Sequence, residues 1–363
     1  YQSFHQPTLD AIKRQNIKQD YLHKLKTEFH SKNVATYNEL IIGLPEETLE
    51  TFIDGVEKCC CPNIKDQLQI YPCVILENTD LRESMDKYGI ETRHCAVGLN
   101  RRKFKYPRFG VDEIVVGTRS MPVNDWMVAY EIAYCFICLF NDRVSYFPML
   151  YLKFVLGAKV TDFVKFVLYD VDKNNKAFPS FARAIKHLRY NRQLILEGKS
   201  SVSPVEGGDG VCLTSHEGMA FLLLDRMEDS YNELKIIIQM FMGLHSYKLE
   251  EDILDEIITY QKVRIPVFDL ETTCYNFNTN IPIVLDNVSR GKEKLPVKRI
   301  VTNVKIKNKS HSYKTEREFN LRRIACGYTM NINDAELIDN IVPLSRNVNL
   351  SGPFEEKVEA FCR

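Results

Sequence analysis

Three polar side chains near the start of this chain have the chemistry to hold a small organic ligand. They are Gln2, Arg14 and Glu39, and a glycine turn begins at Gly43. A carboxylate accepts two hydroxyl hydrogen bonds, which suits a ribose, and a guanidinium forks onto a carboxylate group. Barrel enzymes bind ligands where an apolar strand ends in a sharp turn beside polar groups. The residue types therefore indicate a candidate ligand site, provided that the elements between them bring them to one rim.

Those elements are expected to alternate between strand and helix over the first 77 residues. The expected order is a strand end at 1–4, helices at 7–15 and 21–29, a strand at 40–42, a helix at 48–60 and a strand at 68–71. Leu40, Ile41 and Ile42 form the apolar run of a buried parallel strand that ends at Gly43. Thr48 is suited to cap the helix that follows. This alternation is the repeat of an α/β barrel or a doubly wound sheet.

The stretch from Gln2 to Thr48, with QSFHQPTLDAIKRQNI and YNELIIGLPEET, resembles the fourth and fifth strands of radical S-adenosylmethionine (radical SAM) barrels. The resemblance implies an α/β fold, the second half of a (β/α) TIM-like barrel. In that family a glutamine ending the fourth strand and an acidic residue on the fifth contact the ribose, and an arginine on the intervening helix binds the methionyl carboxylate. Gln2, Glu39 and Arg14 occupy the matching places.

The resemblance also implies roles for smaller residues of the same rim. Ile41 matches the apolar residue that flanks adenine, and Cys73 falls where a small residue of the sixth strand lies behind that ring. Gly43 opens the turn of the expected cofactor site. Glu46 stands where many family members have glycine, which leaves the exact shape of this loop open.

The cysteine motif that makes such a barrel catalytic does not occur in this chain. Radical SAM enzymes hold a 4Fe-4S cluster with a CxxxCxxC loop, and no three of the 11 cysteines here have that spacing. The resemblance therefore implies an enzyme whose cluster ligands and amino-terminal half lie upstream of Tyr1. It would generate a 5′-deoxyadenosyl radical when intact and be inactive as this fragment. A cluster-free, barrel-derived binding or scaffold module is the alternative.

The rest of the chain looks, more loosely, like the carboxy-terminal extension of cobalamin-binding radical SAM proteins, from EIVVGTRSMPVNDW onward. This part implies cobalamin as a further cofactor, methyl transfer as one reaction, and flavodoxin or ferredoxin as electron donor. The substrate, a small molecule or another compound, is not identified. The expected domains are the barrel half at 1–80, a mostly helical extension at 81–199, and a helical, then mixed α+β region at 211–363. Within them we expect a strand at 113–118, helices over 122–196 and 217–261, a loop at 200–210 and a strand at 300–306.

The composition is that of an ordinary globular protein. Hydrophobic residues make up 45% and charged residues 26% of 363, and 48 basic side chains balance 48 acidic ones, so no global field attracts nucleic acid or an anionic membrane. The longest apolar run, 127–140, contains Glu131 and is too short to cross a bilayer. The cysteines lack the regular spacing of a secreted disulfide scaffold. These features predict a cytoplasmic protein with reduced thiols and no membrane partner.

Two further patterns have a structural explanation that we prefer. Consecutive cysteines at 59–61 point in different directions, and Cys135 with Cys138 lack a second pair, so neither set predicts a metal site. The stretch 290–323 holds 12 Lys or Arg against three acidic residues. Its VKIKNK alternation favours a lysine-lined sheet edge over a nucleic-acid partner. The RNA alternative predicts salt-sensitive binding that is lost when Lys305, Lys307 and Lys309 are neutralised.

Overall fold

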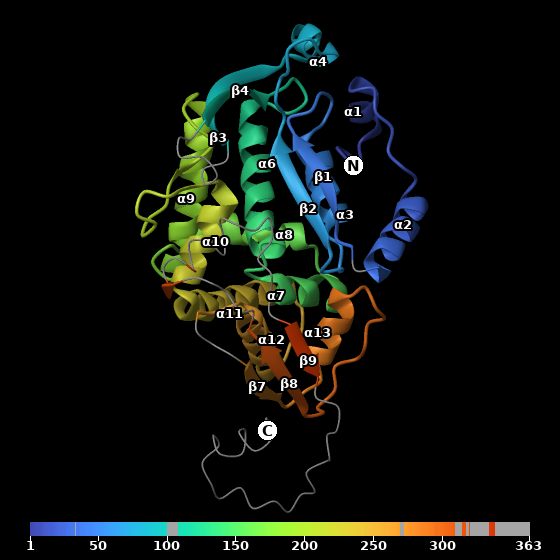
Figure 1. Cartoon of the computed structure of the whole chain (residues 1–363), viewed down its shortest axis with the longest axis vertical. Coiled ribbons are helices and arrows are strands. Elements are labelled where there is room, and N and C mark those ends of the chain that lie inside the picture. Colours follow the sequence, from blue (N-terminus) through green and yellow to red (C-terminus); the bar gives the residue numbers. More distant parts are fainter. Residues whose placement is uncertain are drawn as a thin grey trace, which may run out of the picture.

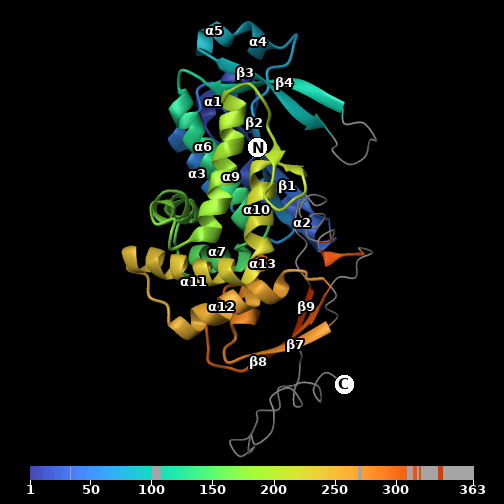
Figure 2. The same cartoon turned by 90° about the vertical axis from the view of Figure 1, so that its left-hand side faces the viewer.

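The computed structural model describes residues 1–32, 34–99, 108–268, 272–308, 314–316, 319 and 334–337. Helices dominate and fill the middle of the molecule, and the small sheets lie beside them and at the two ends (Figures 1 and 2). The helices are α1 (Gln6–Ala11), α2 (Gln19–Ser31), α3 (Leu49–Cys59), α4 (Asp80–Glu83), α5 (Met85–Tyr88), α6 (Val123–Phe136), α7 (Tyr146–Leu150), α8 (Val160–Lys165), α9 (Pro179–Leu196), α10 (Ser215–Asp225), α11 (Met227–Leu244), α12 (Glu251–Arg264) and α13 (Ile281–Ser289), with π-helical turns η1 (Ile137–Asn141), η2 (Tyr151–Val155) and η3 (Phe166–Val171). The strands are β1 (Thr36–Ile42), β2 (Asp66–Pro72), β3 (Glu91–Leu99), β4 (Arg108–Gly117), β5 (Ser203–Pro204), β6 (Cys212–Leu213), β7 (Thr272–Phe277), β8 (Thr302–Lys307) and β9 (Asp334–Leu337).

A βαβ unit forms the part of the fold that carries the predicted site residues. β1 and β2 pair in parallel, with Glu39 opposite Gln69, and α3 connects them. Thr48 caps α3 as expected, because its Oγ1 accepts a hydrogen bond from the Thr51 N–H at 3.2 Å. This mixture of helices and small sheets is compatible with the expected α/β class. In the described part of the chain the parallel sheet has two strands, so the barrel stays a prediction.

The β1–β2 sheet has one buried face and one open face. Side chains alternate along each strand, and those packed into the main core are Leu40, Ile42, Leu68 and Ile70. The opposite side chains, which we call the open face, are Tyr37, Glu39, Ile41, Gln67, Gln69 and Tyr71. Tyr37 is 61% exposed and Tyr71 is 44% exposed, and the other four side chains are partly exposed, so this face is only partly covered. A parallel sheet is normally covered on both faces, which makes the open face unusual.

The main core continues from this sheet through the helices. One apolar cluster extends from Leu40 to Ile306 and includes the aromatic side chains of α6 and its neighbours. Trp126, Tyr130 and Tyr134 succeed one another on α6 with ring centroids 5.2 and 4.3 Å apart. The predicted helical regions at 122–196 and 217–261 are thus confirmed, and most of their aromatic residues are buried in the core, with Tyr190 an exposed exception.

One helical stretch has the length and composition of a membrane span. It runs from Val123 to Asn141 through α6 and η1, and 72% of its most apolar window is buried inside the protein. In Figure 1 this helix stands beside β1 and β2 in the middle of the upper half. Its apolar character is accounted for by its place in the core.

Several local predictions are wrong or incomplete. The helix expected at 7–15 ends at Ala11, because Lys13 adopts a left-handed backbone with φ of 53°. The stretch 1–4 forms no regular strand, although Gln2 still pairs with β1 as described below. β3, which pairs with β4 in an antiparallel hairpin, was not expected. Cys274 is disulfide-bonded, so the expectation of reduced thiols fails at that residue.

The strand expected at 300–306 exists, but it is not a sheet edge. β8 lies between β7 and β9, with Val304 and Ile306 buried and Lys307 paired with Glu336 at 2.8 Å. Alternation reveals only that one face is buried, and a central strand of a one-sided sheet gives the same pattern as an edge. Lys309 lies outside the described residues, as do 310–313, 317–318 and 320–323 of this stretch.

Candidate functional site

The carboxyl ends of β1 and β2 lie at one end of the molecule with α1 and α4 (Figure 1). The Ile41 N–H donates to the Gln2 carbonyl at 3.2 Å, so Gln2 continues the sheet beside β1. On the other side, the Cys73 N–H donates to the Ile42 carbonyl at 2.8 Å. The backbone therefore brings Gln2, Ile41 and Cys73 into adjacent rows. We call this end of the sheet the rim.

A small apolar cluster, separate from the main core, lies at the rim. Its buried members, the rim cluster, are Leu44, Cys73, Ile75 and Val115. Partly buried side chains that pack against it are Ile12, Ile41, Leu81, Met85 and Ile90. The two residues predicted to flank adenine, Ile41 and Cys73, thus meet at one apolar surface. Such a surface suits the faces of a flat aromatic base.

Cys73 belongs to this cluster as a packing residue. Its side chain is 4% exposed, and burial raises the pKa of the thiol to about 12. The thiol is therefore protonated at neutral pH and unsuited to nucleophilic or redox chemistry. A small neutral residue behind a ligand ring is the role that its position allows.

The three polar residues are arranged less tightly. Glu39 is on the open face, Gln2 is partly exposed, and neither side chain makes a hydrogen bond or ion pair with another described residue. Arg14 was expected to lie on a helix, but α1 ends three residues before it. Its side chain is exposed and lines a hollow of about 650 Å³ with Asp10, Lys13 and Gln15.

The turn that carries Arg14 is nevertheless fixed to the rim. Ile12 packs against the rim cluster, and the Lys13 Nζ pairs with the Asp80 carboxylate of α4 at 2.6 Å. Arg14 follows directly, and its N–H donates to the Leu9 carbonyl at 2.8 Å. Arg14 is therefore attached at the rim with its guanidinium available, although the described residues show no contact that joins it to Gln2 or Glu39.

Gly43 is required by the shape of the turn after β1. Its φ of +87° is a conformation that side chains disfavour, and a Cβ placed there would lie 3.2 Å from Val115 Cγ1 and 3.4 Å from Trp126 Cδ1. A glycine is thus needed both for the backbone and for the close approach of β4 and α6. Its place in the rim agrees with the predicted turn, and a ligand contact stays a prediction.

Glu46 explains why related turns use glycine at this position. Its φ is 62°, in the left-handed region, although its side chain is exposed. We expect Glu46→Gly to stabilise the folded chain by up to about 1 kcal/mol, since glycine avoids the steric cost of that region. Glu46→Ala is the matched control and should give no such gain. Urea unfolding monitored by circular dichroism measures both, and an equal gain in both variants would contradict the steric explanation.

A buried carboxylate that the sequence did not reveal holds this turn to the amino-terminal segment. Glu47 is 2% exposed, and its Oε1 accepts a hydrogen bond from Thr51 Oγ1 at 2.6 Å. The Ser3 hydroxyl also donates to the carboxylate. Because Ser3 follows Gln2, Glu47 fixes Gln2 beside the turn. Adjacent glutamates at 46 and 47 look alike in sequence, so no signal distinguishes the buried one from the exposed one.

Glu47 should also affect how stability depends on pH. Burial raises its pKa above the usual value, although hydrogen bonds from Ser3 and Thr51 oppose the shift. A carboxyl group whose pKa is raised by folding stabilises the folded state at pH values below its unfolded pKa of about 4.3. That stabilisation is lost as the pH rises through the folded pKa. We therefore expect Glu47→Gln, compared with wild type, to gain relative stability from pH 4 to pH 7. Urea midpoints across that range test this, and a relative loss toward pH 7 would contradict it.

Two curated proteins are similar to part of this chain. A cobalamin-dependent radical SAM methyltransferase, TokK of Streptomyces tokunonensis, is 29% identical over 164 residues, 45% of this chain and 24% of its own length. A 2-(S-pantetheinyl)-carbapenam-3-carboxylate methyltransferase of Streptantibioticus cattleyicolor is 25% identical over 147 residues, 40% of this chain and 22% of its own length. The matched stretch is thus about a quarter of these relatives. No family model matches the chain. The similarity supports a relation to the radical SAM superfamily and to its methyltransferases.

Proposed function

We propose that this chain is the carboxy-terminal part of a cobalamin-dependent radical SAM methyltransferase. The rim carries the proposal, because Gln2, Ile41 and Cys73 lie in adjacent rows at the end of a parallel sheet, where the family resemblance expects the cofactor. The similarity to TokK, a protein of that description, supports the same class.

S-adenosylmethionine fits the residues of the rim. Gln2 and Glu39 would bind the ribose hydroxyls, and Arg14 would bind the methionyl carboxylate with its planar fork. Ile41 and Cys73 would flank the adenine. When bound next to a reduced 4Fe-4S cluster, this cofactor supplies the carbon radical for the reaction. The chain's own residues orient it and exclude water, since the difficult chemistry belongs to the cofactor.

The cluster would be held by residues upstream of this chain. Within the described residues, no group of three or more His, Cys, Asp or Glu side chains is placed to bind a metal ion. The cobalamin would likewise be bound by an upstream domain. We therefore propose that this fragment alone is inactive, and that the electron donor, a flavodoxin or ferredoxin, docks on the intact enzyme.

Exposed apolar side chains on the open face and near α2 support the proposal that further barrel strands cover this surface in the intact protein. Tyr37 and Tyr71 are exposed on the open face, and Ile17 (53%) and Tyr21 (62%) are exposed beside and on α2. In Figure 1, α2 lies on the outer side of β1. We propose that the remaining barrel strands continue the sheet beyond the segment that ends at Gln2 and enclose the open face. An uncovered edge and face of this kind predict aggregation of the isolated fragment.

The other features of the proposal follow from this class. The division into 1–80, 81–199 and 211–363, a cytoplasmic location and an unidentified, non-nucleic-acid substrate all stay proposals. The lysines of β8 lie at the end of the molecule opposite α4 and the rim (Figure 1), so nucleic acid bound there would be far from the cofactor.

Electron paramagnetic resonance of the intact protein tests this proposal. The protein is reconstituted anaerobically with iron and sulfide, reduced, and titrated with S-adenosylmethionine. We expect a 4Fe-4S signal whose g values change when the cofactor binds. A protein that forms no cluster would contradict the enzyme and favour the cluster-free binding module, as would an upstream coding sequence without CxxxCxxC.

A further inference from the structure

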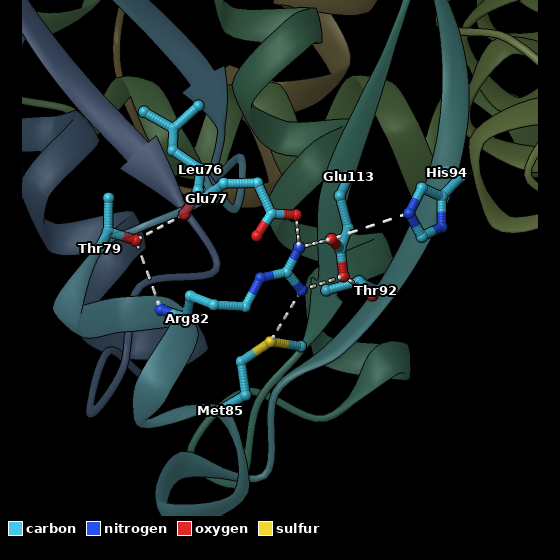
Figure 3. Close-up of polar contacts among 8 residues, drawn as sticks. All are labelled: Leu76, Glu77, Thr79, Arg82, Met85, Thr92, His94 and Glu113. Carbon is cyan, nitrogen blue, oxygen red and sulfur yellow. Dashed lines mark hydrogen bonds and ion pairs between the residues drawn. The ribbon is translucent and has the colours of Figure 1, made fainter.

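An ion cluster connects the segment after β2 to the β3–β4 hairpin at the rim. The Arg82 guanidinium of α4 makes a bidentate ion pair with Glu113 of β4, which we call the Arg82 fork. Nη1 donates to Oε1 at 3.1 Å and Nη2 donates to Oε2 at 2.6 Å. Its Nη2 also donates to Glu77 Oε1 at 2.6 Å. Figure 3 shows the guanidinium between these two carboxylates, which come from the β2–α4 loop and from β4.

Glu113 is held in place from several directions. Thr92 Oγ1 donates to Glu113 Oε1 at 2.8 Å, and His94 Nε2 lies 3.7 Å from Oε2. The Glu113 carbonyl accepts the Ile75 N–H at 2.9 Å, so the residue also pairs with the chain leaving β2. The carboxylate is 10% exposed, and the hydrogen bond from Arg82 lowers its pKa. Glu113 is therefore a fixed, ionised anchor for a side chain arriving from α4.

The segment that Arg82 anchors cannot hold its own shape. α4 and α5 have four residues each, far fewer than an independent helix needs. Thr79 caps α4 by accepting the Arg82 N–H at 3.4 Å, and it donates to the Leu76 carbonyl at 2.7 Å (Figure 3). The position of α4 and α5 thus depends on tertiary contacts, of which the Arg82 fork is the strongest polar one.

This segment covers the rim cluster. Leu81 and Met85 pack against the apolar side chains among which Ile41 and Cys73 lie. Asp80 on the same segment pairs with Lys13, next to Arg14. The α4–α5 segment therefore touches both the predicted adenine surface and the turn that carries the predicted carboxylate ligand.

We propose that Arg82 and Glu113 are positioning residues that fix the α4–α5 segment over the rim and thereby complete the S-adenosylmethionine site. This inference rests on the proposed function. Neither residue touches the cofactor. Their bidentate pair holds Leu81 and Met85 against the rim cluster.

Arg82→Met in the intact, cluster-reconstituted protein tests the inference, because methionine keeps the side chain's length but removes the fork. We expect the dissociation constant for S-adenosylmethionine, measured by isothermal titration, to rise about tenfold, as expected for losing a strong charge-assisted pair. Hydrogen exchange should become faster for amides of residues 76–90 and stay unchanged in α9. Arg82→Lys should be intermediate, since an ammonium cannot fork, and Glu113→Gln should resemble Arg82→Met.

Arg299→Met is the matched control. Arg299 also bridges two carboxylates, those of Glu250 and Asp252, but away from the rim. It should leave cofactor affinity unchanged. Faster exchange at 76–90 with unchanged affinity in Arg82→Met would overturn the inference and leave the proposed function intact. A wild-type protein that binds no S-adenosylmethionine would overturn the proposed function and the inference together.

Discussion

Replacing Arg14 with alanine in the intact protein is expected to weaken S-adenosylmethionine binding by roughly ten- to a hundredfold, the effect of losing a charge-assisted, bidentate contact. The Arg14 side chain is exposed, and its turn is held to the rim by the packing of Ile12. Its removal should therefore cost no packing and leave folding unchanged. Equilibrium titration of the reconstituted protein with the cofactor measures the change.

Lys13→Ala is the control for the Arg14 variant, because it removes a neighbouring cation from the same turn. Its pairing with Asp80 is exposed on both sides, with the two side chains 75% and 72% exposed, so losing it should have little effect. We expect cofactor affinity to change less than about twofold, within the range of weak surface pairs. If Arg14→Ala binds the cofactor as tightly as wild type, Arg14 is not a ligand of the site.

Gly43→Ala is expected to destabilise the folded chain by about 2–4 kcal/mol, a large part of a typical folding free energy. Two costs combine at this position. The φ of +87° disfavours any side chain, and the added Cβ would press on Val115 and Trp126 of the rim and the core. The urea midpoint of the intact protein, with unfolding detected as loss of protease resistance, measures this destabilisation.

Gly157→Ala separates the two costs. Gly157 has a similar φ of +77°, but no atom lies within 4 Å of its hypothetical Cβ. This variant should lose only the backbone part, about 1 kcal/mol. Equal losses in the two variants would mean that the contacts with Val115 and Trp126 do not matter, and that the turn is less tightly packed than the structure indicates.

The βαβ unit could be predicted because its signals are local. The apolar run at 40–42, the glycine that ends it and the Thr48 cap each specify one boundary, and all three are found in the structure. The same apolar run predicts a fully buried strand, whereas Ile41 lies on the open face of β1. The place of Gln2 at the end of the preceding strand came from the family resemblance, and the backbone hydrogen bond from Ile41 to Gln2 is compatible with it.

The features that were missed depend on contacts between distant segments. β3 pairs with β4, and the sequence between them has no strong turn signal. β8 becomes central only because β9 joins it from a later part of the chain. Arg82 and Glu113 are 31 residues apart, and single charged residues are exposed by default. Likewise, the helix at Gln6–Ala11 stops early because of the backbone at Lys13, which propensity does not reveal.

The most direct test of the proposed enzyme is the release of 5′-deoxyadenosine. The intact protein is reconstituted anaerobically, reduced with dithionite, mixed with S-adenosylmethionine and cobalamin, and analysed by liquid chromatography with mass spectrometry. We expect 5′-deoxyadenosine from the wild type and much less from Arg14→Ala at a low cofactor concentration. No 5′-deoxyadenosine from a wild-type protein that holds its cluster and binds the cofactor would contradict the radical SAM function.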